Sequence, residues 1–143
     1  MISDNQINQI NQIKDENLSN TNITLFRNDL EMTHQKKLLE IVIKHGYIDR
    51  LKIAIEMGFR DIFYRDLCSI AACHGSLNCL KYLHEELSFP INYLDIYLAL
   101  VNGHLNCVIY LQEKGVQLTP SMKALAANRN NCCIVKYIRK HQF

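Results

Sequence analysis

Residues 71–83 read AACHGSLNCLKYL and residues 99–111 read ALVNGHLNCVIYL. The two stretches share alanine at the first position, glycine at the fifth, Leu-Asn-Cys at the seventh to ninth, and Tyr-Leu at the end. Self-similarity at a fixed period is typical of repeat proteins. The match predicts an internal repeat, and the rest of the chain can be aligned to it in both directions.

The glycines follow the same period. Gly46, Gly75 and Gly103 stand at nearly equal intervals along the chain, and Gly58 and Gly115 follow Gly46 and Gly103 at one shared spacing. An asparagine stands one further interval beyond Gly103, and asparagine is the non-glycine residue that best tolerates a left-handed backbone. We therefore expect these positions to be the repeat turns: Gly46, Gly58, Gly75, Gly103, Gly115 and Asn130.

Apolar residues on either side of the turns predict two helices in each unit. They recur at the second, fifth and eighth positions after each turn marker, which is the residue at position 46, 75, 103 or 130. Leu77, Leu80 and Leu83 do so after Gly75, and this spacing places them on one helix face. Four positions before the marker stands a small residue in three units, such as Ala71, which allows two helices to approach closely. Because one such pair cannot bury both helices alone, the units must stack. The sequence predicts an all-α fold, an α-solenoid of four helix-turn-helix units, approximately 34–63, 64–92, 93–120 and 121–143.

Several residues mark where helices start and stop. Thr119-Pro120 is typical of a helix cap followed by proline at the first helical position, and Asp66 and Asp95 are candidates to cap or charge helix starts. Pro90 predicts a break between the second and third units.

The two quoted stretches resemble the ankyrin repeat, matching its A-A-x-x-G-H-L-x-x-V-K-x-L core, and Glu113-Lys114-Gly115 is similar to the turn that closes its second helix. The resemblance covers residues 34–143. The units are shorter than the ~33 residues of an ankyrin unit and lack its T-P-L-H start. The missing residues fall between units, so we expect shortened fingers. The pattern is most similar to abbreviated ankyrin units of large DNA viruses and amoeboid protists.

Residues 1–33 differ in character from the rest. They are polar and of low complexity, with Asn-Gln-Ile three times over residues 5–13, and they carry two basic against five acidic residues. Too few apolar groups are present to offset the entropy of ordering them. We expect a mobile leader, or alternatively a short helix that covers the end of the repeat domain at 34–143.

Composition excludes several classes of protein. No apolar run reaches the roughly 18–20 residues of a membrane helix, and the first residues lack the pattern of a secretory signal. The six cysteines lie within apolar periodic segments, which favours reduced, buried thiols over a disulfide framework. These features predict an intracellular, cytoplasmic protein, in the host cytoplasm if the chain is viral.

No spacing in the sequence predicts catalysis. Motifs for phosphate loops, nucleophile elbows and zinc proteases are absent, so we expect no enzyme, no cofactor and no metal site. Cys73, His74 and Cys79 are soft ligands, but the repeat period explains them better. A column of tyrosines at the repeat spacing, Tyr82, Tyr110 and Tyr137, is interpreted as packing between units.

Residues between the units are the candidates for recognition. Aromatic and charged side chains of the kinds that anchor interfaces cluster there, and the ankyrin resemblance implies that partners contact the fingers and the first-helix side. The candidates are Phe59, Arg60, Asp61, Phe63, Tyr64, Phe89, Asn92 and Tyr93. The alternative is that Phe63 and Phe89 simply seal gaps between units.

The expected function is non-catalytic binding of an unidentified partner protein, in a host cell if the chain is viral, by a monomer that presents preorganised side chains. The alternative is binding of nucleic acid or an acidic partner by the basic C-terminal end, because no acidic residue follows Glu113. A third possibility is a remnant of a longer array.

Overall fold

A computed structural model describes residues 32–141, with only the backbone described for residues 32–34 and 60–65. The predicted leader at 1–33 lies outside the described residues, apart from the backbone at its end. The described part of the chain contains helices and no strand, so the prediction of an all-helical fold is confirmed. The α-helices are α3 (Met32–Lys44), α4 (Ile48–Glu56), α5 (Arg60–His74), α6 (Leu77–Lys81), α7 (Tyr93–Val101), α8 (Leu105–Glu113), α9 (Pro120–Asn128) and α10 (Cys132–His141), and a π-helix, η1 (Tyr82–Glu86), continues α6.

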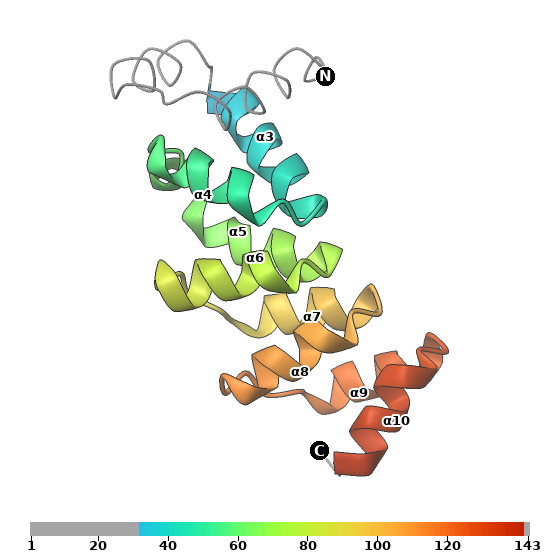
Figure 1. Ribbon diagram of the computed structural model, residues 1–143. Coiled ribbons are helices and arrows are strands. Elements are labelled where there is room, and N and C mark those ends of the chain that lie inside the picture. The colour runs from blue at the N-terminus through green and yellow to red at the C-terminus, as the bar shows by residue number, and fades with distance from the viewer. Residues whose placement is uncertain (1–31, 142–143) are drawn as a thin grey trace.

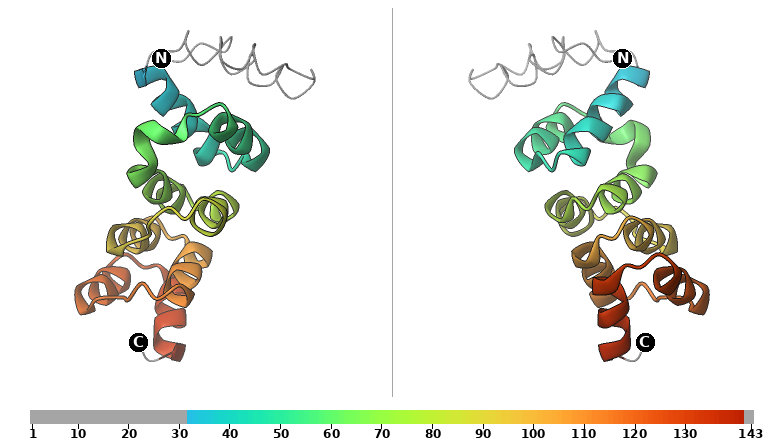
Figure 2. Two further views of the ribbon diagram at one scale, coloured as in Figure 1. Left: turned by 90° about the vertical axis from the view of Figure 1, so that its left-hand side faces the viewer. Right: turned by 90° about the vertical axis from the view of Figure 1, so that its right-hand side faces the viewer.

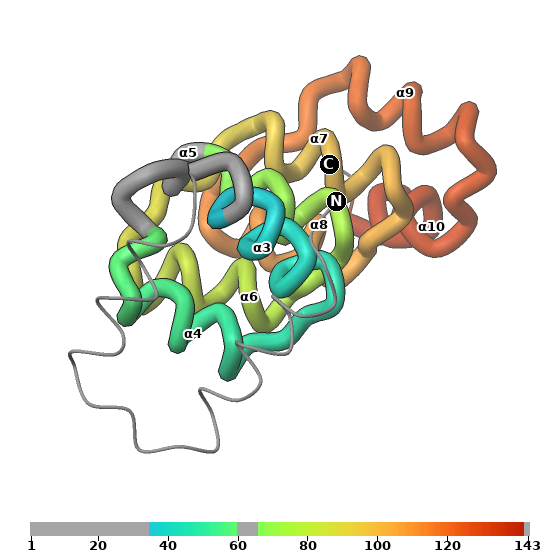
Figure 3. The backbone as a smooth tube through the Cα atoms, turned by 90° about the horizontal axis from the view of Figure 1, so that it is seen from above, coloured from blue at the N-terminus to red at the C-terminus, as the bar shows by residue number. Residues whose placement is uncertain are grey.

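The helices form successive pairs that lie in two layers (Figures 1 and 2). One layer holds α3, α5, α7 and α9, and each of these helices packs against the next one in that layer. The other layer holds α4, α6 with η1, α8 and α10. Viewed from above, the pairs are progressively offset from α3 and α4 to α9 and α10 (Figure 3). The described chain is thus a repeat-like helical fold.

The turn inside each of the first three pairs has the same geometry. Gly46, Gly75 and Gly103 have φ values of +68°, +71° and +83°, and Asn130 has +54° in the fourth turn. The residue after each of these glycines donates its backbone N–H to the carbonyl four positions before the glycine, as Ser76 does to Ala71 at 2.9 Å. This is the Schellman pattern, which requires a left-handed residue. The predicted left-handed backbone is confirmed at all four positions.

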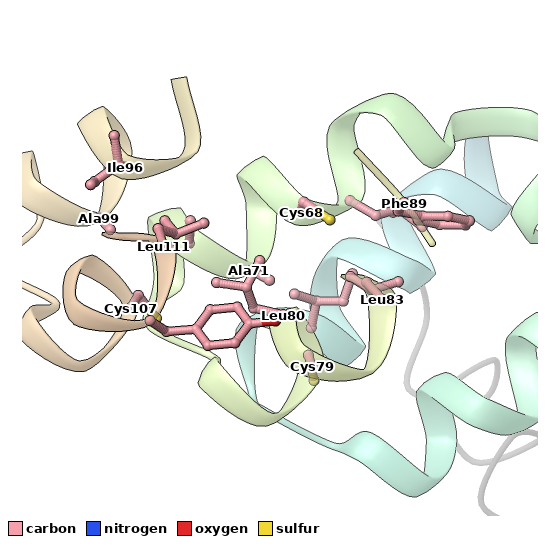
Figure 4. Packing of buried hydrophobic residues seen from close by; sticks show 14 of the residues in the cluster. Cys68, Ala71, Cys79, Leu80, Leu83, Phe89, Ile96, Ala99, Cys107 and Leu111 are labelled. Atoms are coloured by element: carbon pink, nitrogen blue, oxygen red, sulfur yellow. The ribbon is translucent and has the colours of Figure 1, made fainter. Parts of the chain in front are cut away.

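The core runs continuously between the two layers (Figure 4). Ala71, Ala99 and Ala126, the small residues four positions before the turns, are fully buried. Leucines of the second helices, such as Leu80 and Leu111, are fully buried as well. These small side chains therefore allow neighbouring helices to approach closely.

Side chains next to the turns also connect neighbouring pairs. Ser76 Oγ donates to the carbonyl of Ile43, His104 Nε2 to the carbonyl of Cys73 at 3.0 Å, and Asn131 Nδ2 to the carbonyl of Leu100 at 3.2 Å. Each donor directly follows a turn marker, and each acceptor lies at the end of the first helix of the preceding pair. These bonds satisfy carbonyls that a helix C-terminus leaves without an intrahelical donor.

The second pair is longer than its neighbours at the end of its second helix. In the first and third pairs a left-handed glycine, Gly58 or Gly115, follows the turn marker at one shared spacing. In the second pair the left-handed residue is Ser88, with φ +57°, and it comes one position later. The π-helix η1 accommodates the added residue, and Leu87 N donates to Tyr82 O across its wider turn at 3.3 Å.

Helix boundaries confirm some expectations and correct others. Thr119 caps α9 through a 3.3 Å bond from Met122 N, with Pro120 at the first position, as predicted. Asp95 also lies at the start of a helix, as predicted. Asp66 does not, because α5 already begins at Arg60, inside the segment assigned to the first unit.

Candidate binding groove

Two of the aromatic residues predicted to contact a partner are buried. Phe59 is 0% exposed and Phe89 is 8% exposed, and both belong to the core. Their burial contradicts the expectation that they are exposed between the units, and Phe89 packs in the core, which agrees with the alternative that it seals a gap between units. The side chains of Arg60, Asp61, Phe63 and Tyr64 lie outside the described part of the structure.

The remaining two candidates lie at the start of α7. Asn92 is the N-cap residue: its Oδ1 accepts from Leu94 N at 2.8 Å, and its backbone N–H donates to Asp95 Oδ2 at 2.6 Å, which completes a capping box. Asn92 therefore stabilises the start of α7. Tyr93 is 69% exposed and is available for contact with a partner.

A groove of about 590 Å³ crosses the face formed by α3, α5 and α7. Its apolar floor consists of Ile41, Ile70 and Leu98, one from each helix, and all three are half-buried. They occupy one repeat phase, five positions before each turn marker. The same phase on α9 holds Leu125, also half-buried, so the apolar column continues beside the groove.

Exposed apolar side chains gather next to this column. Among the described residues the large exposed hydrophobic ones are Tyr47, Tyr93, Leu94 and Tyr97, and three of these four belong to α7. Leu94 is 43% exposed and lines the groove, and Tyr97, 38% exposed, follows it by three positions, which places both on one side of α7. An exposed apolar patch of this kind commonly marks an interaction site.

Charges of both signs border the groove. Glu40 and Lys44 line it from α3, and Asp66 lines it from α5. Lys36 Nζ lies 3.8 Å from Asp66 Oδ2, so the acidic side of the border is partly neutralised. The border selects neither a strongly acidic nor a strongly basic occupant.

A buried carboxyl group fixes α7 against α5 beneath the groove. Asp95 is 0% exposed, and its Oδ1 accepts from Ser69 Oγ, a groove-lining hydroxyl, at 2.5 Å. Burial raises the pKa of Asp95, although the hydrogen bonds from Ser69 and Asn92 favour its charged form. The bond joins α5 to α7, the helix that carries Leu94 and Tyr97.

The six thiols are all free, and they differ in exposure. Cys68, Cys79 and Cys107 are buried as predicted, and burial raises their pKa to about 12, 11 and 11, which makes them poor nucleophiles. The prediction of burial is wrong for Cys132 and Cys133, which are exposed at the start of α10. Cys73 is half-buried and lines the groove.

The tyrosine column lies on the second-helix layer, and its packing role is confirmed where it is best defined. Tyr110 is 4% exposed, and its hydroxyl donates to Glu85 Oε1 at 3.2 Å. A hydrogen bond from Lys114, whose Nζ is 2.9 Å from Glu85 Oε1, lowers the pKa of Glu85, while burial and the Glu85 charge raise the pKa of Tyr110. Lys81 Nζ lies 5.6 Å from the centre of the Tyr110 ring, a cation–π contact between neighbouring pairs.

Other kinds of site find no support in the described residues. The side chains described at 35–59 and 66–141 contain no group of three or more potential metal ligands, and none of the described helices has the length and apolar character needed to cross a bilayer. Lys136, Arg139 and Lys140 are exposed on α10, and the last two lie in its final turn, where cations complement the helix dipole. Comparison of the chain with models of known protein families, with curated proteins and with solved structures found no match.

Proposed function

We propose that the chain is a non-catalytic protein-binding module, an α-solenoid of four ankyrin-like units with shortened fingers. The observation that carries the proposal is the groove on the first-helix layer, where half-buried Ile41, Ile70 and Leu98 adjoin exposed Leu94 and Tyr97. A helical stack holds such side chains in place before binding, so little conformational entropy is lost when a partner docks.

The expected mode of binding is insertion of apolar partner side chains into the groove. Leu94 and Tyr97 would be the anchors, because they combine apolar area with exposure, and Tyr93 would extend the contact along the connection to the second pair. This assigns recognition to the first-helix face and moves it away from Phe59 and Phe89.

A capture experiment with matched variants tests the proposal. The bait carries Leu94→Asp and Tyr97→Asp together, and the control carries Tyr47→Asp, an equally exposed residue (45%) on the turn between α3 and α4. The native chain and the control should retain the same partner from an extract of the source cells, and the double variant should lose it. Retention by the double variant, with unchanged circular dichroism, would contradict the proposed surface.

The basic C-terminal end supports a second candidate function, binding of nucleic acid or an acidic protein. Lys136, Arg139 and Lys140 are exposed, and no acidic residue follows Glu113. Affinity for nucleic acid should fall steeply as salt rises, whereas an apolar interface responds weakly. Replacing the three residues by Gln should abolish binding only if this second function is the correct one.

A further inference from the structure

We propose that the groove is occupied by the chain's own N-terminal segment, residues 5–13, bound in an extended conformation with Ile7, Ile10 and Ile13 on its floor. The inference concerns the same groove as the proposed function, but its test needs no partner. The two proposals can therefore fail independently.

The floor of the groove presents apolar groups at a regular interval. Ile41, Ile70 and Leu98 come from three neighbouring helices of one layer, each packed against the next. Packed helices lie about 8–10 Å apart. The groove therefore offers one apolar contact about every 9 Å along the line that crosses α3, α5 and α7.

The N-terminal segment carries apolar groups at a matching interval. Asn-Gln-Ile occurs three times over residues 5–13, so an isoleucine stands at every third position. An extended polyproline II chain has about three residues per turn and rises about 3.1 Å per residue, which puts the isoleucines on one side about 9.3 Å apart. In an α-helix the same three positions rise only about 4.5 Å, half the interval of the floor. The match therefore selects the extended conformation.

The polar residues of the segment suit the border of the groove. Asn and Gln amides both donate and accept hydrogen bonds, so they can pair with Glu40 and Asp66 as well as with Lys44. Residues 5–13 carry no charged side chain, which suits a border that has charges of both signs.

The connection is long enough for this binding. Residues 14–31 separate Ile13 from the start of α3 at Met32, and fully extended they span about 60 Å. The path from Met32 along α3 to Ile41 is about 14 Å, and crossing to α7 adds about 20 Å. Tethering also gives the segment an effective concentration of the order of millimolar at the groove. A partner of the groove must then displace it.

The test measures the alkylation rate of Cys73, which lines the groove, in the full chain. Iodoacetamide labelling is resolved by mass spectrometry at each cysteine, and exposed Cys132 and Cys133 serve as internal references. The variant replaces Ile7, Ile10 and Ile13 by Ser, and the matched control replaces Asn5, Asn8 and Asn11 by Ser.

Removing the isoleucines should raise the Cys73 alkylation rate about tenfold, as expected if the tethered segment binds with a dissociation constant of about 0.1 mM at millimolar effective concentration. The asparagine control should raise it much less, and the reference cysteines should keep their rates. Equal Cys73 rates in the native chain and the isoleucine variant would overturn the proposal. So would an equal rise in both variants, because the contact would then not depend on the apolar side chains.

Discussion

Two features disfavour a side chain at Gly75: its left-handed backbone and the neighbouring His104 ring. Its φ of +71° disfavours any side chain, and a Cβ there would lie 2.4 Å from His104 Nδ1. The His104 ring cannot move away without breaking its 3.0 Å bond to the Cys73 carbonyl. Gly115 has φ +96° but no atom within 4 Å of a Cβ, so it carries the conformational restriction alone.

Alanine at these two positions should therefore separate backbone strain from steric conflict. We expect Gly115→Ala to lower the free energy of unfolding by about 1–2 kcal/mol, the cost of a left-handed alanine. Gly75→Ala should lower it by about 2–4 kcal/mol, because overpacking adds to that cost. Urea denaturation measures both, and equal losses would show that His104 does not crowd the turn.

Asp95 should make the stability of the chain depend on pH in a defined direction. Burial raises its pKa in the folded state above the ordinary value of 3.8, so folding takes up a proton between the unfolded and the folded pKa. The free energy of unfolding then decreases as pH rises through that window, with a slope of up to about 1.4 kcal/mol per pH unit, and Asp95 contributes no further change above it.

The matched variant for this effect is Asp95→Asn, which cannot ionise. Relative to that variant, the native chain should gain stability as pH falls through the folded pKa of Asp95, and the difference should become constant below about 3.8. Urea denaturation at several pH values from neutral to acid gives the difference. If the native chain instead lost stability relative to Asn over this range, the hydrogen bonds from Ser69 and Asn92 would outweigh the burial of the carboxylate.

At the scale of the element, the π-helix η1 leaves Ser88 in a left-handed conformation that costs free energy. Ser88→Gly should raise the free energy of unfolding by about 0.5–1 kcal/mol, since glycine adopts φ +57° without a steric penalty. Ala124→Gly, at an exposed position in the middle of α9, should instead lower it by a similar amount. Thermal denaturation followed by circular dichroism compares the two, and destabilisation by both would contradict the assignment of strain to Ser88.

The elements differ in how well sequence predicts them. Glycine spacing predicted the turns, because a left-handed residue is required there and few residue types supply it. The π-helix was not predicted, because one inserted residue changes the hydrogen-bonded ring without removing the apolar residues around it. Asp66 predicts too late a start for α5, because Phe59 precedes the helix with helical φ and ψ and no side-chain cap marks the boundary.

At the scale of the molecule, sequence predicts the side of the groove but not the groove itself. The ankyrin resemblance implies that partners contact the first-helix side, and Ile41, Ile70 and Leu98 lie on that side. Periodicity cannot tell whether a second layer covers such a face, so the half-exposure of these side chains became clear only from the packing. Sequence does not predict the burial of Phe59 and Phe89 for a related reason: position between units says where a residue lies in the chain, not whether its side chain packs in the core.

The arrangement of pairs also predicts how stability is distributed along the chain. Asn131 Nδ2 binds the Leu100 carbonyl at 3.2 Å and so connects the last pair to the third, while His104 makes the corresponding bond between the third pair and the second. In an array stabilised by nearest-neighbour contacts, weakening the contact between two pairs destabilises the pairs that lie between that contact and the end of the array. Asn131→Ala should therefore raise hydrogen exchange in α9 and α10 about fivefold, for a lost bond of about 1 kcal/mol, and leave α3 to α8 unchanged.

Two further variants give this prediction its contrast. His104→Ala should raise exchange over α7 and α8 as well as α9 and α10, because its junction lies one pair earlier. Asn128→Ala, an exposed substitution of the same type on α9, should change none of the helices. Exchange that rose evenly from α3 to α10 in the Asn131 variant would mean that the pairs open as one cooperative unit, and nearest-neighbour coupling would then not describe this molecule.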